Sequence, residues 1–219
     1  MQIFDIPINS KRMETTRIGT FDFPLAVHKN DLKKNVLGFV NWHWHYEFQL
    51  TYVVRGTISV FFNQQTIDLH EGQGIYINPE VLHMIRDRYD SDAMFISLDV
   101  SPKLLTSFPN SVFERSYVRP VFRSPAADVV VLDPQVPWQK KILDEAISIE
   151  QDYKSRSFGW ELAVSSSLYA IWKELVCHLQ ESLAEHDAPA ADGARLRRNH
   201  RIKEILAYIR EHFTEKITL

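Results

Sequence analysis

Residues 41–49, with the sequence NWHWHYEFQ, decide the fold because polar and aromatic side chains alternate along them. In a β-strand, side chains two residues apart point to the same face. His43 and His45 are therefore expected to point in one direction, with Glu47 and Gln49 extending the same row. The opposite face is aromatic and aliphatic, and consists of Trp42, Trp44, Tyr46, Phe48, Leu50 and Tyr52. One polar row and one apolar row predict a small β-barrel whose interior is a binding site.

Short apolar segments separated by turn residues lie on both sides of this stretch. Glycines and the Asn78-Pro79 step mark the turns. The regular spacing is typical of an all-β barrel or sandwich rather than of alternating strands and helices. The predicted strands are residues 23–28, 46–54, 57–62, 74–77, 82–88 and 93–100. Ser101-Pro102 indicates the start of a helix, and the path of residues 101–135 is left open.

After Pro137 a helical period replaces the strand period. Apolar residues at three- and four-residue steps predict one helix, and Ser157 is expected to cap a second, longer one. The four-residue link, residues 154–157, makes the two helices antiparallel neighbours. Their apolar stripes are Ile142, Ala146, Ile149 and Tyr153, then Val164, Leu168, Ile171, Leu175, Leu179 and Leu183. Two alternatives stay open: the helices only cover the barrel, or one stripe also contacts a second copy of the chain.

Residues 186–194, HDAPAADGA, have the composition of a linker, with small residues, Pro and Gly and no periodicity. A basic cluster from Arg195 to Arg201 then leads into another amphipathic pattern, marked by Ile202, Ile205, Leu206, Ile209 and Phe213. A lone helix of about 20 residues is marginal in water without a partner. This helix is therefore expected either to dock on the barrel or to be the first helix of a further domain.

The composition is that of an ordinary globular chain, with 45% hydrophobic and 24% charged residues among 219. A formal net charge of −3 argues against a strongly basic nucleic-acid-binding surface. The single cysteine, Cys177, precludes an internal disulfide and favours a reducing compartment; its helical pattern predicts a buried side chain. The N-terminus lacks the features of a signal peptide, and no apolar run approaches the ~18 residues of a membrane span. We therefore expect a cytoplasmic protein without membrane contact.

Three histidines and one oxygen ligand would form a donor set suited to zinc, manganese, iron or nickel. His43 and His45 are placed together by the strand period. His83 joins them only if the strand after Asn78-Pro79 lies beside the first. The alternative is a metal-free pocket in which hydrogen bonds hold the imidazoles in fixed tautomers. The residues alone leave both alternatives open.

The spacing of these residues resembles the two motifs of the cupin family. The first is similar to Gly38-x4-His43-x-His45-x3-Gln49-x6-Gly56, and the second to Gly72-x6-Pro79-x3-His83. The resemblance implies a mainly β fold with appended helices: a cupin barrel, or double-stranded β-helix, followed by an antiparallel helix pair. It also implies a metal held by two histidines and a glutamate of the first motif and one histidine of the second.

This sequence departs from the cupin pattern at Gln49, where the family has glutamate. A neutral amide oxygen replaces a carboxylate, which weakens the attraction for a divalent transition metal as a cofactor. Glu47, two residues earlier on the expected face, offers a carboxylate, although not at the position of the motif.

Longer segments resemble the sensing domain of AraC-type transcription regulators. They are residues 41–50, NWHWHYEFQL, residues 53–56, VVRG, and residues 69–83, LHEGQGIYINPEVLH. Residues 199–219 are similar to the opening helix of the DNA-binding domain of that family. The resemblance implies four parts: a cupin ligand-sensing barrel (1–135), a helical dimerisation appendage (136–186), a linker (187–198) and the first helix of a truncated helix-turn-helix domain (199–219).

The function expected from this resemblance is sensing. The barrel binds a small-molecule effector and changes the geometry of a homodimer, which controls DNA binding by the missing C-terminal part. His43, His45, Gln49 and His83 are expected to line the pocket and to contact the effector or a metal, and none is expected to be catalytic. The alternative is a metal-dependent cupin enzyme, a dioxygenase or isomerase. The identity of the effector, the target genes and the direction of regulation do not follow from the sequence.

Residues 1–21 are polar enough to form an arm that closes over the barrel mouth. This expectation rests on the family resemblance alone. Deleting residues 1–15 is then expected to weaken effector binding.

Overall fold

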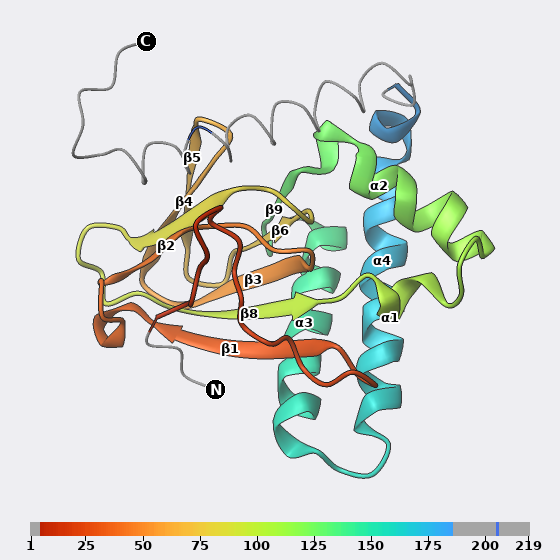
Figure 1. Ribbon diagram of the computed structural model, residues 1–219, viewed down its shortest axis with the longest axis horizontal. Helices are drawn as coiled ribbons and strands as arrows, with labels where there is room; N and C mark the ends of the chain where they lie inside the picture. The colour runs from red at the N-terminus through yellow and green to blue at the C-terminus, as the bar shows by residue number, and fades with distance from the viewer. Residues whose placement is uncertain (1–4, 186–204, 206–219) are drawn as a thin grey trace.

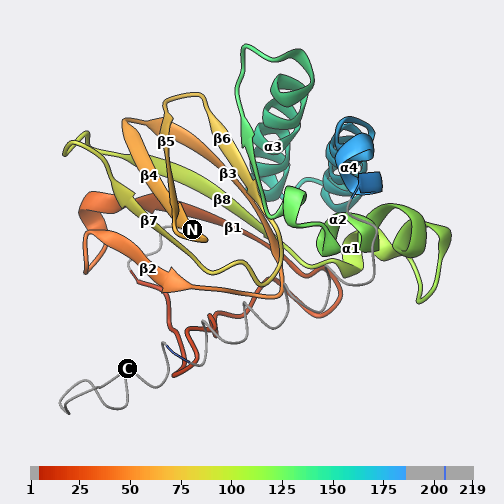
Figure 2. The same cartoon turned by 90° about the horizontal axis from the view of Figure 1, so that it is seen from above.

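Two antiparallel β-sheets face each other, and a pair of long helices packs against the outer face of one sheet in the computed structural model (Figures 1 and 2). The structure describes residues 5–185 and residue 205. The predicted fold, a cupin-type barrel followed by an antiparallel helix pair, is confirmed. The linker predicted for residues 187–198 and the helix predicted for 199–219 lie outside the described residues, apart from Ile205.

The larger sheet separates the barrel interior from the helices. Its strand order is β1 (Leu25–Asp31), β8 (Met94–Val100), β3 (Phe48–Arg55), β6 (Gly74–Ile77) and β9 (Val129–Leu132). Because side chains alternate along each strand, Leu50, Tyr76 and Leu98 pack toward the helices. Gln49, Ser97 and Asp99 face the barrel interior and line its cavity. The sheet is therefore apolar on its helix side and partly polar on its inner side.

The smaller sheet brings two of the predicted site residues together. Its strand order is β2 (Phe39–His43), β7 (His83–Asp87), β4 (Thr57–Phe62) and β5 (Gln65–His70). In the β2–β7 pair, His43 lies directly opposite His83. The expectation that the strand after Asn78-Pro79 lies beside the first histidine strand is confirmed.

Residues 41–49 do not form one strand, and this prediction is wrong. Strand β2 ends at His43 and β3 begins at Phe48, so residues 44–47 cross from the small sheet to the large one. Backbone bonds hold the crossing: the Trp44 N–H donates to the Arg12 carbonyl at 3.0 Å, and the Glu80 N–H donates to the His45 carbonyl at 2.8 Å. The alternating rows therefore stop at His43 and start again at Phe48.

The segment left open by the sequence, 101–135, connects the barrel to the helices through short elements. Helix α1 (Lys103–Thr106) confirms the start indicated by Ser101-Pro102. A π-helical turn η2 (Phe113–Val118), helix α2 (Arg119–Arg123) and a 3₁₀ turn η3 (Pro125–Ala127) follow α1. A further 3₁₀ turn, η1 (Leu32–Lys34), lies outside this segment, directly after β1. The indole N–H of Trp172 donates to the Tyr117 carbonyl at 3.1 Å and ties η2 to the helix pair.

Helices α3 (Pro137–Ser155) and α4 (Trp160–Glu185) form the predicted pair. Residues 156–159 link them, instead of 154–157, and α4 begins three residues after Ser157. Arg156 takes a left-handed conformation at the end of α3, and its guanidinium stacks on Tyr153 and Trp160. Gly159, with a φ of 85°, directly precedes α4. No helix in the described part of the chain is long and apolar enough to cross a membrane.

The expectation for Cys177 is wrong, because its side chain is exposed. The buried stripe of α4 runs through Val164, Leu168, Ile171 and Leu175. Residue 177 lies about 200° further around the helix than residue 175 at 100° per residue, so it faces away from that stripe.

Candidate functional site

Three imidazoles converge inside the barrel, as the sequence predicts. Ring centroids lie 4.2 Å apart for His43 and His83, 5.4 Å for His45 and His83, and 5.6 Å for His43 and His45. One nitrogen from each ring falls within 4.8 Å of the other two, and all three side chains are buried. His43 comes from β2, His83 from β7 and His45 from the crossing segment. The fold thus assembles a compact nitrogen cluster from three separate backbone segments.

Backbone carbonyls fix the orientation of each ring. The Nδ1 atoms of His43, His45 and His83 lie 2.8, 2.9 and 2.9 Å from carbonyl oxygens of Asn41, Glu47 and Val81, respectively. A carbonyl only accepts, so each Nδ1 carries its hydrogen and donates it. In the neutral imidazole, the Nε2 lone pair is then free. This is the arrangement that orients histidines for metal binding in known sites.

Gln49, on β3, adds an oxygen to the cluster from the opposite sheet. Its Oε1 lies 3.1 Å from His45 Nε2 and 3.2 Å from His83 Nε2, while its Nε2 donates to the Thr51 hydroxyl at 2.7 Å. Neutral imidazoles and an amide oxygen would then face each other as acceptors, which a cation between them would stabilise. With the amide turned over, its two N–H groups donate to both imidazoles and no cation is needed. The donor set fits a divalent transition ion and also fits a metal-free network.

Burial lowers the pKa of two of the imidazoles, those of His43 and His83, and so keeps them neutral. It is the main cause that lowers the pKa of His83 to about 3, with the nearby His45 adding to the effect. The pKa of His43 is also well below its usual value, first because of burial and then because of His83 and His45. Neutral imidazole is the form that binds metal ions, so this part of the site needs no deprotonation step near pH 7.

Glu47 does not extend the row of His43 and His45, and this expectation is wrong. Its carboxylate lies 4.0 Å from His45 Nδ1, the nitrogen that bonds to backbone, rather than at the Nε2 side. The cause is the crossing at residues 44–47, which breaks the strand period before Glu47. The carboxylate offered by Glu47 is therefore not placed to substitute for the missing glutamate.

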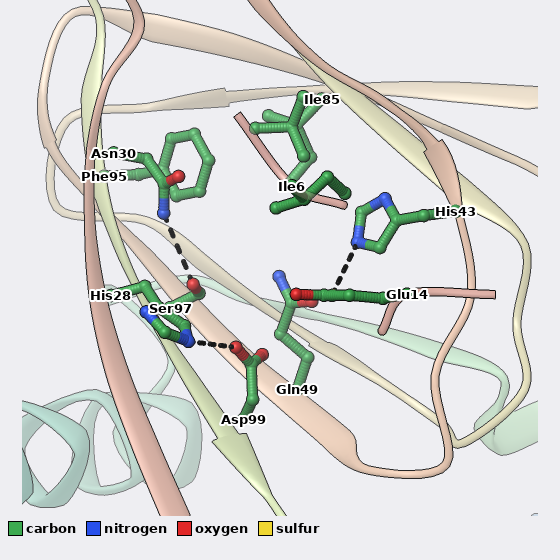
Figure 3. A pocket seen from close by; sticks show the side chains of 11 residues that line it. Ile6, Glu14, His28, Asn30, His43, Gln49, Ile85, Phe95, Ser97 and Asp99 are labelled. Carbon is green, nitrogen blue, oxygen red and sulfur yellow. Dashed lines mark hydrogen bonds and ion pairs between the residues drawn. The ribbon is translucent and has the colours of Figure 1, made fainter. Parts of the chain in front are cut away.

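The structure adds polar residues that the sequence prediction missed. A cavity of about 20 Å³ inside the barrel has room for about one water molecule or an ion. His43 and Gln49 line it together with Glu14 from the N-terminal segment, and with His28, Asn30, Ser97 and Asp99 from β1 and β8 (Figure 3). The remaining lining is apolar and consists of Ile6, Val40, Ile85 and Phe95.

His28 and Asp99 form a second polar pair in this cavity. His28 Nε2 lies 3.4 Å from Asp99 Oδ2, and both side chains are buried (Figure 3). Burial raises the pKa of Asp99 to about 7 and lowers the pKa of His28 to about 4. Between about pH 4 and pH 7 both groups are therefore mainly uncharged, which costs less in a low-dielectric interior than an ion pair.

A larger cavity of about 530 Å³ lies outside the barrel, between β1 and the turn that joins α3 to α4. Phe23, Tyr153 and Trp160 provide aromatic walls. The charged lining residues are of both signs: Arg17, Arg156, Asp22 and Glu161. His28 lines this cavity as well as the inner one. The two cavities therefore share one side chain.

The comparisons with known proteins agree with this architecture. Residues 35–171 match the profile of the AraC-like ligand binding domain. The uncharacterized HTH-type transcriptional regulator YdeC of Bacillus subtilis (strain 168) is 32% identical over 219 residues, covering 100% of this chain and 71% of YdeC.

Two solved structures represent the structural neighbours. ToxT from Vibrio cholerae has a TM-score of 0.38 at 10% identity, over 57% of this chain and 47% of ToxT. A cupin 2 conserved barrel domain protein from Salinispora arenicola has a TM-score of 0.28 at 16% identity, over 29% of this chain and 54% of that protein. The family profile and the whole-chain match to YdeC carry the assignment. The chain belongs to the AraC-type family of transcription regulators, and its barrel is the ligand-sensing domain of that family.

Proposed function

We propose that the effector of this sensing domain binds in the barrel lumen, at His43, His45, Gln49 and His83. The observation that carries the proposal is the convergence of three imidazoles and an amide oxygen inside a cavity-bearing barrel. An effector regulates only if it binds one arrangement of the protein better than another. A site that joins residues from both sheets meets this requirement, because its geometry depends on how the sheets are placed.

The proposed occupant of the imidazole cluster is a divalent transition-metal ion. The free Nε2 lone pairs of the three histidines and the oxygen of Gln49 would hold it. When bound, such an ion acts as a Lewis acid that can take up oxygen or nitrogen atoms of a small molecule. The adjoining cavity of about 20 Å³, which His43 and Gln49 line but His45 and His83 do not, suits an ion or a water molecule. A larger effector requires that Ile6 or Glu14 of the N-terminal segment move aside.

Elemental analysis of the full chain, purified without chelator, tests this site. We expect close to one equivalent of metal in the wild type, and little in a His43→Ala variant. His70→Ala is the matched control, since His70 is exposed on β5 and outside the cluster. Equal metal content in all three proteins would contradict binding at the cluster. Absence of metal from the wild type, even after incubation with Mn²⁺, Co²⁺ or Zn²⁺, would leave the metal-free network as the state of the site.

We propose that the site binds rather than catalyses. Support comes from the neutral Gln49 at the motif position and from the regulator relative. The alternative, a metal-dependent cupin dioxygenase or isomerase, is tested by incubating the metal-loaded chain with candidate acids and sugars. We expect no oxygen consumption and no product. Turnover that disappears in His43→Ala would contradict the proposal.

We propose that the domain forms a homodimer through the exposed face of α4. The predicted stripe of α4 is used inside the molecule, in the core shared with α3 and the large sheet. Leu162 and Tyr169 remain exposed on the other side, at 77% and 38%, and the Tyr169 ring contacts Phe113 of η2. Large apolar side chains exposed on one helix face are typical of an interface between copies.

Sedimentation velocity at several concentrations tests the dimer. We expect a wild-type dimer and a monomeric Leu162→Glu/Tyr169→Glu variant. Phe21→Glu is the control, because Phe21 is equally exposed but lies in the N-terminal segment. A wild-type monomer at 100 μM, roughly the concentration at which weak interfaces assemble, would contradict the proposal.

We propose that the protein contacts DNA through a helix-turn-helix domain. By resemblance, residues 199–219 are the first helix of that domain. Residues 5–185 supply the sensing part. Fluorescence anisotropy with a duplex of random sequence should then detect only weak, salt-dependent binding by the barrel and helix pair. Tight binding to a specific sequence by that part would contradict this division of roles.

A further inference from the structure

A buried carboxylate from the N-terminal segment lies beside the imidazole cluster. Glu14 Oε2 is 3.8 Å from His43 Nε2, the nitrogen that faces the site, and both side chains are only 5% exposed (Figure 3). Two atoms that each lie about 2.1 Å from one ion are at most about 4.2 Å apart. The separation of Glu14 and His43 is therefore compatible with a shared ion.

The charge of the cavity lining indicates what Glu14 would need as a partner. Among the residues that line the cavity, Glu14 and Asp99 are acidic, and none is Lys or Arg. Burying a carboxylate without a positive partner is costly. The Gln49 amide supplies no positive charge, whereas a divalent ion held by the three histidines and Gln49 would. Glu14 would in turn provide the negative charge that Gln49 does not.

The backbone holds Glu14 in this place through the histidine segment itself. The Glu14 N–H donates to the Trp44 carbonyl at 2.9 Å, and the Trp44 N–H donates to the Arg12 carbonyl at 3.0 Å. The Trp44 indole also donates to the Lys11 carbonyl at 2.8 Å. Trp44 lies between His43 and His45 in the sequence, so these bonds tie the segment that carries Glu14 to the segment that carries two of the imidazoles.

We propose that Glu14 is the anionic ligand of the metal site, replacing in space the carboxylate that Gln49 lacks in sequence. This inference rests on the proposed binding of a metal at His43, His45 and His83. Its consequence is that a bound ion connects the N-terminal segment to both sheets. The sequence could not reveal it, because Glu14 is 29 residues before His43 and belongs to neither motif.

Competition with a chromophoric chelator for Co²⁺ and Zn²⁺ tests the proposal on the full chain. We expect Glu14→Gln to weaken affinity 10- to 100-fold, the range found when groups that support a metal site are removed. Glu47→Gln is the matched control, since that carboxylate lies at the Nδ1 side of His45, and it should change affinity less than threefold. The double variant Glu14→Gln/Gln49→Glu should bind metal at least tenfold more tightly than Glu14→Gln, because a carboxylate returns at the motif position.

A second readout follows the N-terminal segment. Trypsin cleavage at Lys11, Arg12 and Arg17 should slow when metal is added to the wild type, and should not slow in Glu14→Gln. If the wild type binds metal and Glu14→Gln shows the same metal affinity and the same protection from trypsin, the role of Glu14 is overturned and the metal site stands. No metal binding by the wild type would overturn the metal site itself. If Glu14→Gln lowers the melting temperature of the metal-free protein, Glu14→Asp is used in its place. Glu14→Asp should show a smaller loss of metal affinity.

Discussion

At the residue scale, the ionisation of Asp99 should make stability depend on pH between about pH 4 and pH 7. Burial raises its pKa to about 7 from an ordinary value of 3.8. Between these values the folded protein keeps a proton that the unfolded chain has lost. The stabilising contribution of Asp99 is thus complete below about pH 4, declines as the pH rises, and levels off above about pH 7.

Replacing Asp99 by Asn should remove this decline. From pH 5 to pH 8, we expect the variant to gain on the order of 2 kcal/mol in free energy of unfolding relative to the wild type. Urea denaturation at both pH values measures it. Asp90→Asn, in an exposed turn, is the control and should not alter the pH dependence. Parallel pH profiles for wild type and Asp99→Asn would show that Asp99 ionises freely in the folded protein.

The residues of the site differ in how far the sequence could predict them. The motifs located His43, His45, Gln49 and His83, and the structure brings all four together. Ser97 and Asp99 carry a signal that was missed, since they alternate with Ile96, Leu98 and Val100 as an inward row does. Glu14 carries no such signal, because its place depends on how a distant, irregular segment folds back.

At the element scale, β6 lies very close to two neighbours. A Cβ atom added at Gly74 would come within 2.5 Å of the Thr51 carbonyl oxygen on β3 and 2.7 Å of Leu143 on α3. The leucine can turn away, but the backbone oxygen of a paired strand cannot. Glycine at this position therefore allows the helix layer to approach the sheet.

Gly74→Ala should lower the free energy of unfolding by about 1–3 kcal/mol, as overpacking does in other cores. Thermal denaturation monitored by circular dichroism measures the loss. Thr66→Ala, at an exposed position of β5, is the control and should have a small effect. An unchanged melting temperature in Gly74→Ala would mean that β3 and β6 separate easily.

Elements with a strong local period were the ones that the sequence could predict. Strand 57–62 follows from alternation, strand 74–77 from a short apolar run after a glycine turn, and the helix pair from apolar stripes. The crossing at residues 44–47 did not, because its aromatic and polar residues alternate as they would in a strand. Contacts of Trp44 with the N-terminal segment outweigh that preference.

At the scale of the whole molecule, the N-terminal segment fills part of the barrel. Ile6 and Glu14 line the cavity, and Ile6 is nearly buried. The N-terminal arm was expected to close over the barrel mouth, whereas two of its residues, Ile6 and Glu14, lie inside the barrel. The composition of the arm could not specify this position. Its removal should affect both stability and the site.

Deleting residues 1–15 should lower the melting temperature and weaken Co²⁺ affinity at least tenfold, because the carboxylate and an apolar wall are lost together. Differential scanning fluorimetry and chelator competition measure the two effects. Removal of residues 2–4 alone is the control, since it leaves Ile6 and Glu14 in place. Unchanged affinity in the longer deletion would contradict a role of the segment in the site.

His28 forms part of the wall of both the inner cavity and the outer one beside Tyr153 and Trp160. A molecule that turns this imidazole from one side changes the surface met from the other, so occupancy of the two cavities is coupled wherever the two occupants favour different orientations of His28. Such coupling is reciprocal: if an occupant outside weakens binding inside, the inner occupant weakens the outer one by the same factor. His28→Ala should abolish that factor while leaving each cavity able to bind, which isothermal titration of each ligand with and without the other measures. The barrel interior and the cavity beside the turn between α3 and α4 would then communicate through the side chain of a single residue, His28.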